Sequence, residues 1–466
     1  MFSDEINNSK IHENYLKWFA LALFFSILSS CRIYYLPELQ IVLIILFGPW
    51  FSGRIKFNYA ALLLCVFCTH FYAIPDAAYR FNSGEYPSIY TKSIDSVKYL
   101  DILVIVLAIS SLYNIKKFNS IFIRTKYPFY LPMFFLLGWK INPSGLYNST
   151  SLLFICRSIL LMVAIALLFS QFSYRQIIEL CTIAVFSWAT KMLFAVLIPA
   201  ENPLYREILG FKLNIPFAGD EYLTLGVYAS IACAAFKTTS SKYIKYLLFA
   251  AFVLCIVAQR KGALQYFGLL ALVIAWGGVS GLRNKIVNLV ILILPWSLSV
   301  FLLLVVPFLP VLLSLAFYEY SQLISSAIES VLHLFKDNFL ASIFGIGPTG
   351  LYEIYGLDPL LDNEFGFVGE VGEKYRYAIW SIPYGRLILN VGVFGFLIHL
   401  IYLLINMRQS AFIFYLYSTI CGVFCFANTT PVEAIAYGIA FAALPKIILV
   451  QAREKMSRKQ ALVSPV

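Results

Sequence analysis

Two adjacent cations, Arg260 and Lys261, lie in the stretch VAQRKGALQ, with one apolar run before them and another directly after. Arginine presents a planar, permanently charged fork that makes paired hydrogen bonds to phosphate oxygens, whereas lysine presents a point charge. Two more cations, Arg157 and Lys191, lie inside apolar runs. A charge within an apolar span is costly and therefore indicates a functional group. We expect these four cations to bind a phosphate-bearing lipid headgroup.

A second group of polar residues lies in the stretch LLDNEFGFVGEVGEKYRY, which contains four carboxylates, Asp362, Glu364, Glu370 and Glu373. A carboxylate can accept the proton of an attacking hydroxyl, so one of these residues is a candidate general base. The alternative is a solvated acidic loop with no role in catalysis. Arg376 and Arg386 follow in the same part of the chain, and either could be a second cation for a departing diphosphate. Aromatic residues of the loop could stack on sugar rings or lie at a membrane interface.

The composition is that of an integral membrane protein. Of 466 residues, 61% are hydrophobic and only 13% are charged, and the mean hydropathy is +0.80. The net charge of +11 does not indicate nucleic-acid binding, because Lys and Arg lie mostly in short loops between apolar runs. All nine cysteines lie within or beside apolar runs, and the pair Cys65 and Cys68 lacks a partner pair at metal spacing. We therefore expect no disulfide, metal site or cofactor.

Apolar runs of membrane-spanning character recur along the whole chain. A bilayer core of roughly 30 Å needs about 20 apolar residues per helix. The sequence predicts an all-α, polytopic membrane protein of about 12–14 helices, forming a single transmembrane domain over residues 1–466. The predicted segments are 15–30, 37–52, 58–75, 99–113, 127–140, 150–170, 176–199, 222–236, 243–259, 262–280, 287–313, 386–406, 410–428 and 433–451.

Charge predicts the orientation of these segments. With both termini in the cytoplasm, nearly every cytoplasmic turn contains Lys or Arg, as in positive-inside topology. The acidic, aromatic loops then lie outside, above all the long loop of residues 314–385. Arg260 and Lys261 fall at the outer face, where orientation does not explain them. Three readings remain open for Arg157 and Lys191, because each could bind a headgroup, snorkel to the interface or pair with a carboxylate such as Asp101 or Glu433.

Three stretches resemble motifs of the O-antigen polymerase and ligase superfamily. Gln259-Arg260-Lys261-Gly262 occupies the position of a turn in which one helix of that family ends and the next begins. IFGIGPTG resembles the Gly-x-Gly that opens the large periplasmic loop of the family, although Gly345, Gly347 and Pro348 could equally form an ordinary turn. RLILNVGVFGFLIHL resembles a later G-x-x-G, with Gly392 and Gly395.

The resemblance implies a fold similar to GT-C glycosyltransferases, located in the bacterial inner membrane as a multi-pass protein. It implies a metal-independent reaction without a cofactor, in which an undecaprenyl-diphosphate-linked glycan is transferred to a second lipid-linked repeat unit. The implied partners are undecaprenyl-diphosphate-linked glycans and membrane lipids, together with a chain-length regulator and a flippase, and no nucleic acid.

Two alternatives to a polymerase stay open. Ligases of the superfamily usually carry a His eleven residues before the first glycine of the G-x-x-G, where this chain has Ser381. That departure favours a polymerase over a ligase that transfers glycan to lipid A core. A flippase or other transporter is a further alternative, but such proteins usually have related halves, and this chain has no obvious internal repeat.

Overall fold

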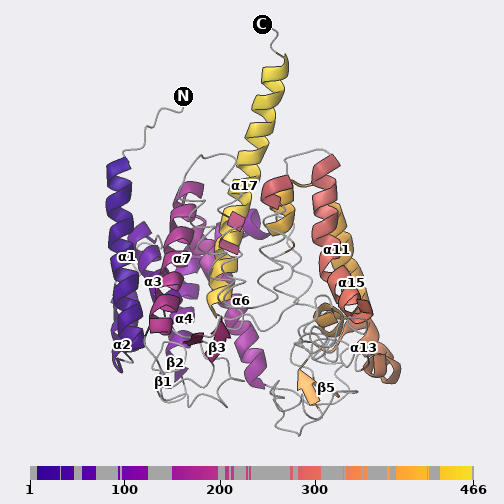
Figure 1. Cartoon of the computed structure of the whole chain (residues 1–466), viewed down its shortest axis with the longest axis horizontal. Helices are drawn as coiled ribbons and strands as arrows, with labels where there is room; N and C mark the ends of the chain where they lie inside the picture. The colour runs from indigo at the N-terminus through magenta and orange to yellow at the C-terminus, as the bar shows by residue number, and fades with distance from the viewer. Residues whose placement is uncertain are drawn as a thin grey trace. The chain divides into compact units, whose positions relative to one another are not determined.

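The computed structural model describes part of the chain. The chain forms two compact units. Unit 1 comprises Met1–Thr125, Ile159–Ala271 and Thr430–Val466, and unit 2 comprises Lys126–Ser158 and Leu272–Thr429 (Figure 1). The structure describes residues 8–31, 33–46, 55–69, 93–94, 97–123, 149–197, 205–208, 211–214, 227–228, 230–231, 273–276, 282–305, 329, 332–347, 351–353, 375–377, 385–416, 418 and 431–463.

Helices dominate the described residues, and most coincide with the predicted apolar segments. They are α1 (Asn8–Ser30), α2 (Leu36–Leu46), α3 (Phe57–Thr69), α4 (Tyr99–Ser111), α6 (Ser149–Phe169), α7 (Tyr174–Leu197), α11 (Leu282–Val305), α13 (Phe339–Phe344), α15 (Gly385–Asn406) and α17 (Pro431–Val463). Three stretches among the described residues are long and apolar enough to cross a membrane: Tyr99–Lys117, Ile388–Asn406 and Pro431–Ala452. Shorter apolar helices lie at Leu16–Ser29, Leu36–Leu46, Phe57–Thr69 and Cys156–Phe169.

Three short antiparallel ribbons accompany the helices, which an all-α prediction did not include. Two of them lie in unit 1 and one in unit 2. Each consists of two strands of two to four residues, so the ribbons shape loops and do not form a sheet core. They pair β1 (Ser93–Ile94) with β2 (Val97–Lys98), β3 (Tyr205–Ile208) with β4 (Phe211–Asn214), and β5 (Leu351–Glu353) with β6 (Tyr375–Tyr377).

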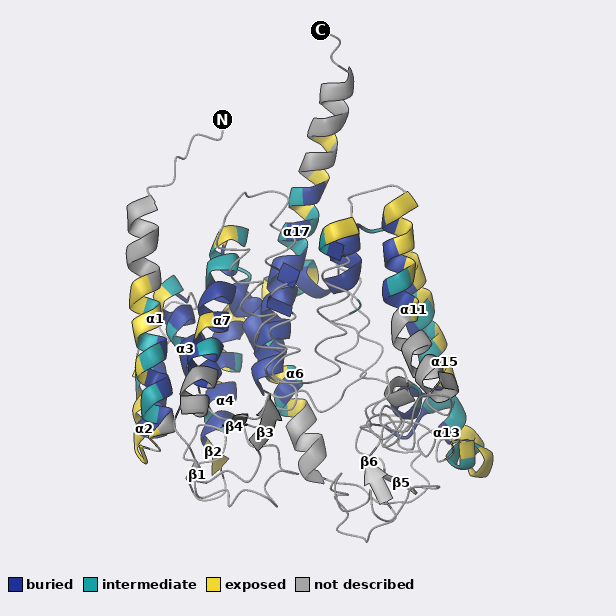
Figure 2. Cartoon of the chain, viewed as in Figure 1, coloured by how far each residue is buried: buried dark blue, intermediate teal, exposed yellow. Residues whose placement is uncertain are grey.

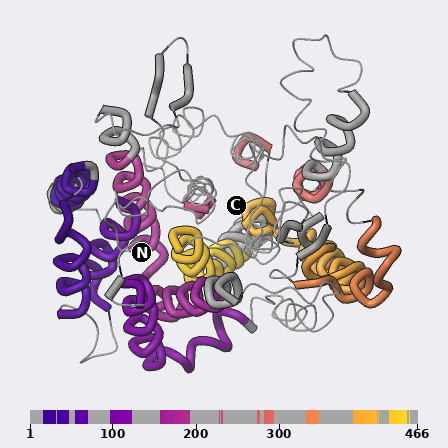
Figure 3. Tube along the Cα trace, turned by 90° about the horizontal axis from the view of Figure 1, so that it is seen from below, coloured from indigo at the N-terminus to yellow at the C-terminus, as the bar shows by residue number. Residues whose placement is uncertain are grey.

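Helices α1 and α7 run parallel in unit 1. Near the middle of both helices, the rings of Phe19 and Phe186 pack edge to face with centroids 6.1 Å apart. Further along both chains, the hydroxyls of Ser26 and Thr190 are 3.0 Å apart and hydrogen-bonded. Residue numbers therefore rise together along the two helices, which lie side by side (Figure 3).

Helix α3 packs against α7 in the same direction. The rings of Phe57, at the start of α3, and Phe172, just before α7, are 6.3 Å apart, and further along Ser187 donates to the sulfur of Cys65 at 3.5 Å. Tyr59, near the start of α3, donates to the carbonyl of Ile44, near the end of α2, so α2 runs the opposite way. Helices α1, α3 and α7 thus form a parallel group in unit 1.

Helix α17 pairs with α6 and runs antiparallel to α7. A Cβ at Gly438 would lie 2.7 Å from the carbonyl oxygen of Met162 and 2.8 Å from the side chain of Ile165, so the helices touch through this glycine. Further along, Lys446 donates to the carbonyl of Ser170 at 3.0 Å. Most of α17 within the apolar span is buried (Figure 2). Because α6 and α7 are joined by a short turn, α17 and α6 both run opposite to α7.

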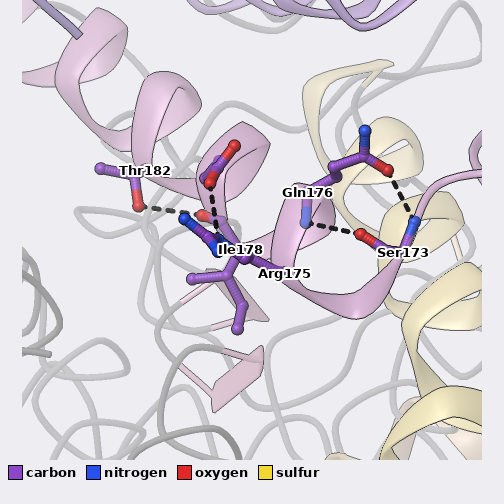
Figure 4. A network of polar contacts seen from close by, with 6 residues as sticks. Ser173, Arg175, Gln176, Ile178 and Thr182 are labelled. Atoms are coloured by element: carbon purple, nitrogen blue, oxygen red, sulfur yellow. Dashed lines mark hydrogen bonds and ion pairs between the residues drawn. The ribbon is translucent and has the colours of Figure 1, made fainter. Parts of the chain in front are cut away.

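A reciprocal pair of hydrogen bonds begins α7 (Figure 4). The Gln176 amide N–H donates to Ser173 Oγ at 3.3 Å, and the Ser173 N–H donates to the side-chain oxygen of Gln176 at 2.9 Å. This arrangement is a capping box, which satisfies amide groups that the first helical turn leaves open. Within the first turns, Arg175 forms an ion pair with Glu179 at 3.3 Å. These contacts stabilise the start of α7 and the turn that joins it to α6.

In unit 2, two buried asparagines of α11 hold the turn that follows α15. Asn284 donates to the carbonyl of Gln409 at 2.9 Å and accepts from the N–H of Ala411 at 2.7 Å. Asn288 donates to the carbonyls of Met407 and Gln409 at 2.8 and 3.1 Å. The side chains thereby satisfy backbone groups at a helix end that would otherwise be buried without partners.

Candidate functional site

Two glycine motifs that lie far apart in the sequence meet in unit 2. The segment after α13 runs alongside α15, where the N–H of Ile346 donates to the carbonyl of Leu389 at 2.8 Å. The N–H of Gly347 donates to the carbonyl of Asn390 at 3.2 Å. We call the meeting of residues 343–347 with residues 389–392 the glycine junction. It joins IFGIGPTG to RLILNVGVFGFLIHL, the second and third stretches of the family resemblance.

Only glycine fits at the two central positions of the glycine junction. A Cβ on Gly345 would lie 2.5 Å from the backbone of Asn390, and a Cβ on Gly392 would lie 2.5 Å from the nitrogen of Phe344 and closer still to the carbonyl of Ile343. Both glycines have positive φ, 78° and 69°, which other residues rarely adopt. Gly345 also ends α13 as its C-cap, with its N–H bonded to the carbonyl of Ala341, so the first motif forms a turn that in addition packs against α15.

Gly392 also breaks α15. With φ 69° and ψ 179°, it interrupts the helical backbone, and helix continues on both sides of it. The break frees the carbonyls of Leu389 and Asn390 from their helical partners, and the N–H groups of residues 346 and 347 take them instead. Asn390 and Ile346 are both fully buried. The glycine junction is thus a close, buried contact between backbones.

The ribbon of β5 and β6 pairs two strands that lie on either side of residues 354–374 in the sequence. Glu353 pairs with Tyr375, and Tyr352 pairs with Arg376. Strand β5 begins four residues after Gly347, and α15 begins soon after β6 ends. The chain between the two strands comprises residues 354–374. The candidate bases Asp362, Glu364, Glu370 and Glu373 belong to this segment and lie outside the described residues.

The candidate cations are placed to different extents. Arg376 lies in β6, and Arg386 lies in the first turn of α15. Arg157 lies on α6 with a partly buried side chain. Arg260 and Lys261 lie outside the described residues, so their assignment stays a prediction.

Lys191 is enclosed within unit 1. Its side chain is only 1% exposed, and it follows Thr190, whose hydroxyl bonds to Ser26 and to the carbonyl of Ser187 at 2.8 Å. A snorkelling lysine would extend its ammonium to water, so the burial does not fit that alternative. Glu433, on α17 of the same unit, is also buried, at 4% exposure. Among the described residues, Lys191 and Glu433 are the buried charged side chains.

His399 is a buried polar group to which the sequence reasoning gave no role. It lies on α15 at 2% exposure, and no hydrogen-bond partner for its Nδ1 is found among the described residues. The hydropathy pattern alone could not separate a core histidine from a lipid-facing one. Within the described part of the chain, no three His, Cys, Asp or Glu side chains lie close enough to hold a metal ion. The described cysteines, Cys31, Cys65, Cys68, Cys156 and Cys181, are free thiols.

No protein-family model, curated protein or solved structure matches the chain. The functional interpretation therefore depends on the residues themselves and on the glycine junction that joins two of the three sequence motifs.

Proposed function

We propose that the protein is a polysaccharide polymerase, which joins undecaprenyl-diphosphate-linked repeat units into O-antigen or a similar surface polysaccharide. In the proposed reaction, a sugar hydroxyl of the acceptor unit attacks the anomeric carbon of the donor glycan. The new glycosidic bond forms as the bond to the diphosphate breaks. The hydroxyl proton passes to a base, and undecaprenyl diphosphate leaves with the electron pair.

The glycine junction is the observation that carries the proposal. Two motifs that resemble the same family could occur by chance in an apolar sequence, but contact between two chance matches is not expected. Here Gly345 lies against the backbone of Asn390 and Gly392 against that of Ile343 and Phe344, in the part of the chain that contains the long loop. The candidate general bases lie in the sequence between β5 and β6, whose pairing brings Glu353 and Tyr375 together.

The residues take roles that the chemistry requires. Arg260 is the proposed first clamp for the departing diphosphate, with Lys261 as a headgroup contact and Arg376 or Arg386 as the second clamp. One of Asp362, Glu364, Glu370 and Glu373 is the proposed base. We keep Arg157 as a headgroup cation because its side chain is partly exposed. For Lys191, we favour an internal role over direct headgroup binding because its side chain is enclosed.

We further propose that the protein spans the bacterial inner membrane with both termini in the cytoplasm. Helix α17 runs antiparallel to α7, and α1 runs parallel to α7, so the first and last helices of unit 1 point in opposite directions. If both cross the membrane, the number of crossings is even. An even number supports twelve or fourteen spans and argues against thirteen. With both termini in the cytoplasm, the three predicted segments after the long loop leave that loop on the periplasmic side, where the polymerisation is proposed to occur.

Two other functions make different predictions. An O-antigen ligase would use the same donor but transfer the glycan to lipid A core, and a flippase would move the lipid-linked unit without making a bond. The test is deletion of the gene, followed by electrophoresis of lipopolysaccharide. A polymerase deletion leaves core capped with one repeat unit, whereas a ligase or flippase deletion leaves uncapped core. Uncapped core would therefore overturn the proposal.

A further inference from the structure

Two backbone carbonyls of α15 have two possible sets of hydrogen-bond donors. In the structure, the carbonyls of Leu389 and Asn390 accept from the N–H groups of Ile346 and Gly347 at 2.8 and 3.2 Å. In a continuous α-helix, the same two carbonyls would accept from the N–H groups four residues later in α15 itself. Docking of residues 346–347 and continuity of the helix therefore compete for the same acceptors.

Gly392 is the residue whose backbone separates the two arrangements. Its φ of 69° and ψ of 179° interrupt the helical path, and helix continues on both sides of it. Glycine adopts positive and negative φ about equally readily, so Gly392 can also take the helical conformation. A residue with a Cβ could not take both, because the Cβ would lie 2.1 Å from the carbonyl oxygen of Ile343 in the observed arrangement. Glycine at this position therefore permits a helix with two states.

Packing and helix continuity favour opposite states. Ile346 is fully buried, and the rings of Phe344 and Phe394 lie 6.5 Å apart across the break, so packing favours the observed arrangement. Gly392 lies about 6 Å inside the apolar stretch that begins at Ile388. A break at that depth is unfavourable, because water cannot replace the missing helical partners in the apolar part of a membrane. The released N–H groups of residues 346 and 347 belong to a loop, where water can replace the bonds that they lose.

We propose that α15 is a conformational switch. In the closed state, which is the observed one, α15 is broken at Gly392 and residues 343–347 dock on it. In the open state, α15 is a continuous helix and residues 345–347 are released. Strand β5 begins four residues after Gly347, so the release frees the chain that leads into the long loop. Use of this opening to admit a lipid-linked substrate rests on the proposed function, whereas the switch itself does not.

The test is hydrogen–deuterium exchange of the purified full chain in detergent, read by mass spectrometry of its peptides well below the unfolding midpoint. The amides of residues 346 and 347 report the glycine junction. The amide of Ala411 is the control, because it donates to Asn284 at 2.7 Å elsewhere in unit 2. Gly392→Ala disfavours the positive φ of the closed state. Exchange at residues 346–347 should therefore be roughly tenfold faster than in the unaltered protein, with exchange at Ala411 unchanged.

Val393→Pro tests the opposite shift. In the closed state, residue 393 is the first of the inner helical segment, where proline is well tolerated because its N–H is not needed. In a continuous helix, the same proline would lose a hydrogen bond and clash with the carbonyl of Leu389. Exchange at residues 346–347 should therefore become roughly tenfold slower. Val393→Ala is the matched control, since it keeps the N–H and should leave the exchange unchanged.

Three outcomes would overturn the proposal. Equal acceleration at residues 346–347 and at Ala411 in Gly392→Ala would indicate general destabilisation. Unchanged exchange at residues 346–347 in Val393→Pro would mean that no continuous helix contributes to the opening, and this variant decides if Gly392→Ala does not fold. Failure of Val393→Pro to fold where Val393→Ala folds would mean that α15 is not broken in the native protein. The expected exchange in a protein that forms no polymer would support the switch and contradict only the proposed function.

Discussion

Gly345 lies against the backbone of Asn390, and Gly392 lies against the backbone of Ile343 and Phe344, so closely that neither glycine position can hold a Cβ. The contact joins the end of α13 to the break in α15, and two backbone hydrogen bonds from residues 346 and 347 complete it. A Cβ would clash at both positions, and other residues rarely adopt a positive φ. Substituting alanine for either glycine, which adds one methyl group, therefore tests the contact.

Gly392→Ala should destabilise the protein. The positive φ alone costs on the order of 1–3 kcal/mol for a residue other than glycine, and the clash with Phe344 adds to it. The thermal unfolding midpoint in detergent, and the abundance in membranes, should both fall. Val393→Ala is the matched control, since Val393 is the next residue, is 43% exposed and has helical backbone. Equal unfolding midpoints and equal abundance of Gly392→Ala and Val393→Ala would mean that the protein does not depend on the close backbone contact at Gly392.

Arg260→Ala should abolish polymer formation, and Arg260→Lys should lose most of it although the charge is kept. A forked guanidinium makes paired hydrogen bonds that an ammonium cannot make. Removing a contact that strengthens as the leaving group gains charge costs on the order of 3 kcal/mol, or about a hundredfold in rate. Lys261→Ala should be tolerated better. The measurement is the polymer length distribution in a deletion strain at matched abundance, where normal laddering from Arg260→Ala would exclude the diphosphate clamp.

Lys191→Arg should lower the unfolding midpoint. Lys191 is 1% exposed, so a larger side chain with the same charge must displace its neighbours, and overpacking typically costs about 1–3 kcal/mol. Lys285→Arg, at an exposed position of α11, should change nothing. If Lys191 instead reached an open headgroup site, arginine would bind phosphate at least as well, and Lys191→Arg would keep both its stability and its activity.

Several helices could be predicted from apolar runs, but predicted segment 287–313 is observed as α11 over 282–305, α13 was not predicted, and segments 127–140 and 243–259 lie outside the described residues. Predicted segments 150–170 and 386–406 begin and end within one residue of α6 and α15. The break in α15 could not be predicted, since it depends on a partner backbone about forty-five residues earlier in the chain. Likewise, a cation inside an apolar run was recognisable at Lys191, but the burial of its side chain depends on packing that hydropathy does not encode.

The proposed sidedness predicts opposite labelling at two positions. In a variant with all nine cysteines replaced, Ser342→Cys in α13 should react with an impermeant thiol reagent from the periplasmic side. Lys116→Cys, in the 3₁₀ helix η3 (Leu112–Lys117) that follows α4, should react only after the cytoplasmic side is opened. The reverse pattern would invert the topology and place the long loop where lipid-linked repeat units are not polymerised.

The most direct measurement is extension of a lipid-linked repeat unit by the purified protein. The protein is reconstituted in liposomes with undecaprenyl-diphosphate-linked repeat units, and the lipid-linked products are separated by size. The proposal predicts products that grow by whole repeat units, remain attached to undecaprenyl diphosphate, and are absent with Arg260→Ala. Transfer of the glycan only when lipid A core is supplied, or no new glycosidic bond at all from correctly folded protein, would contradict it.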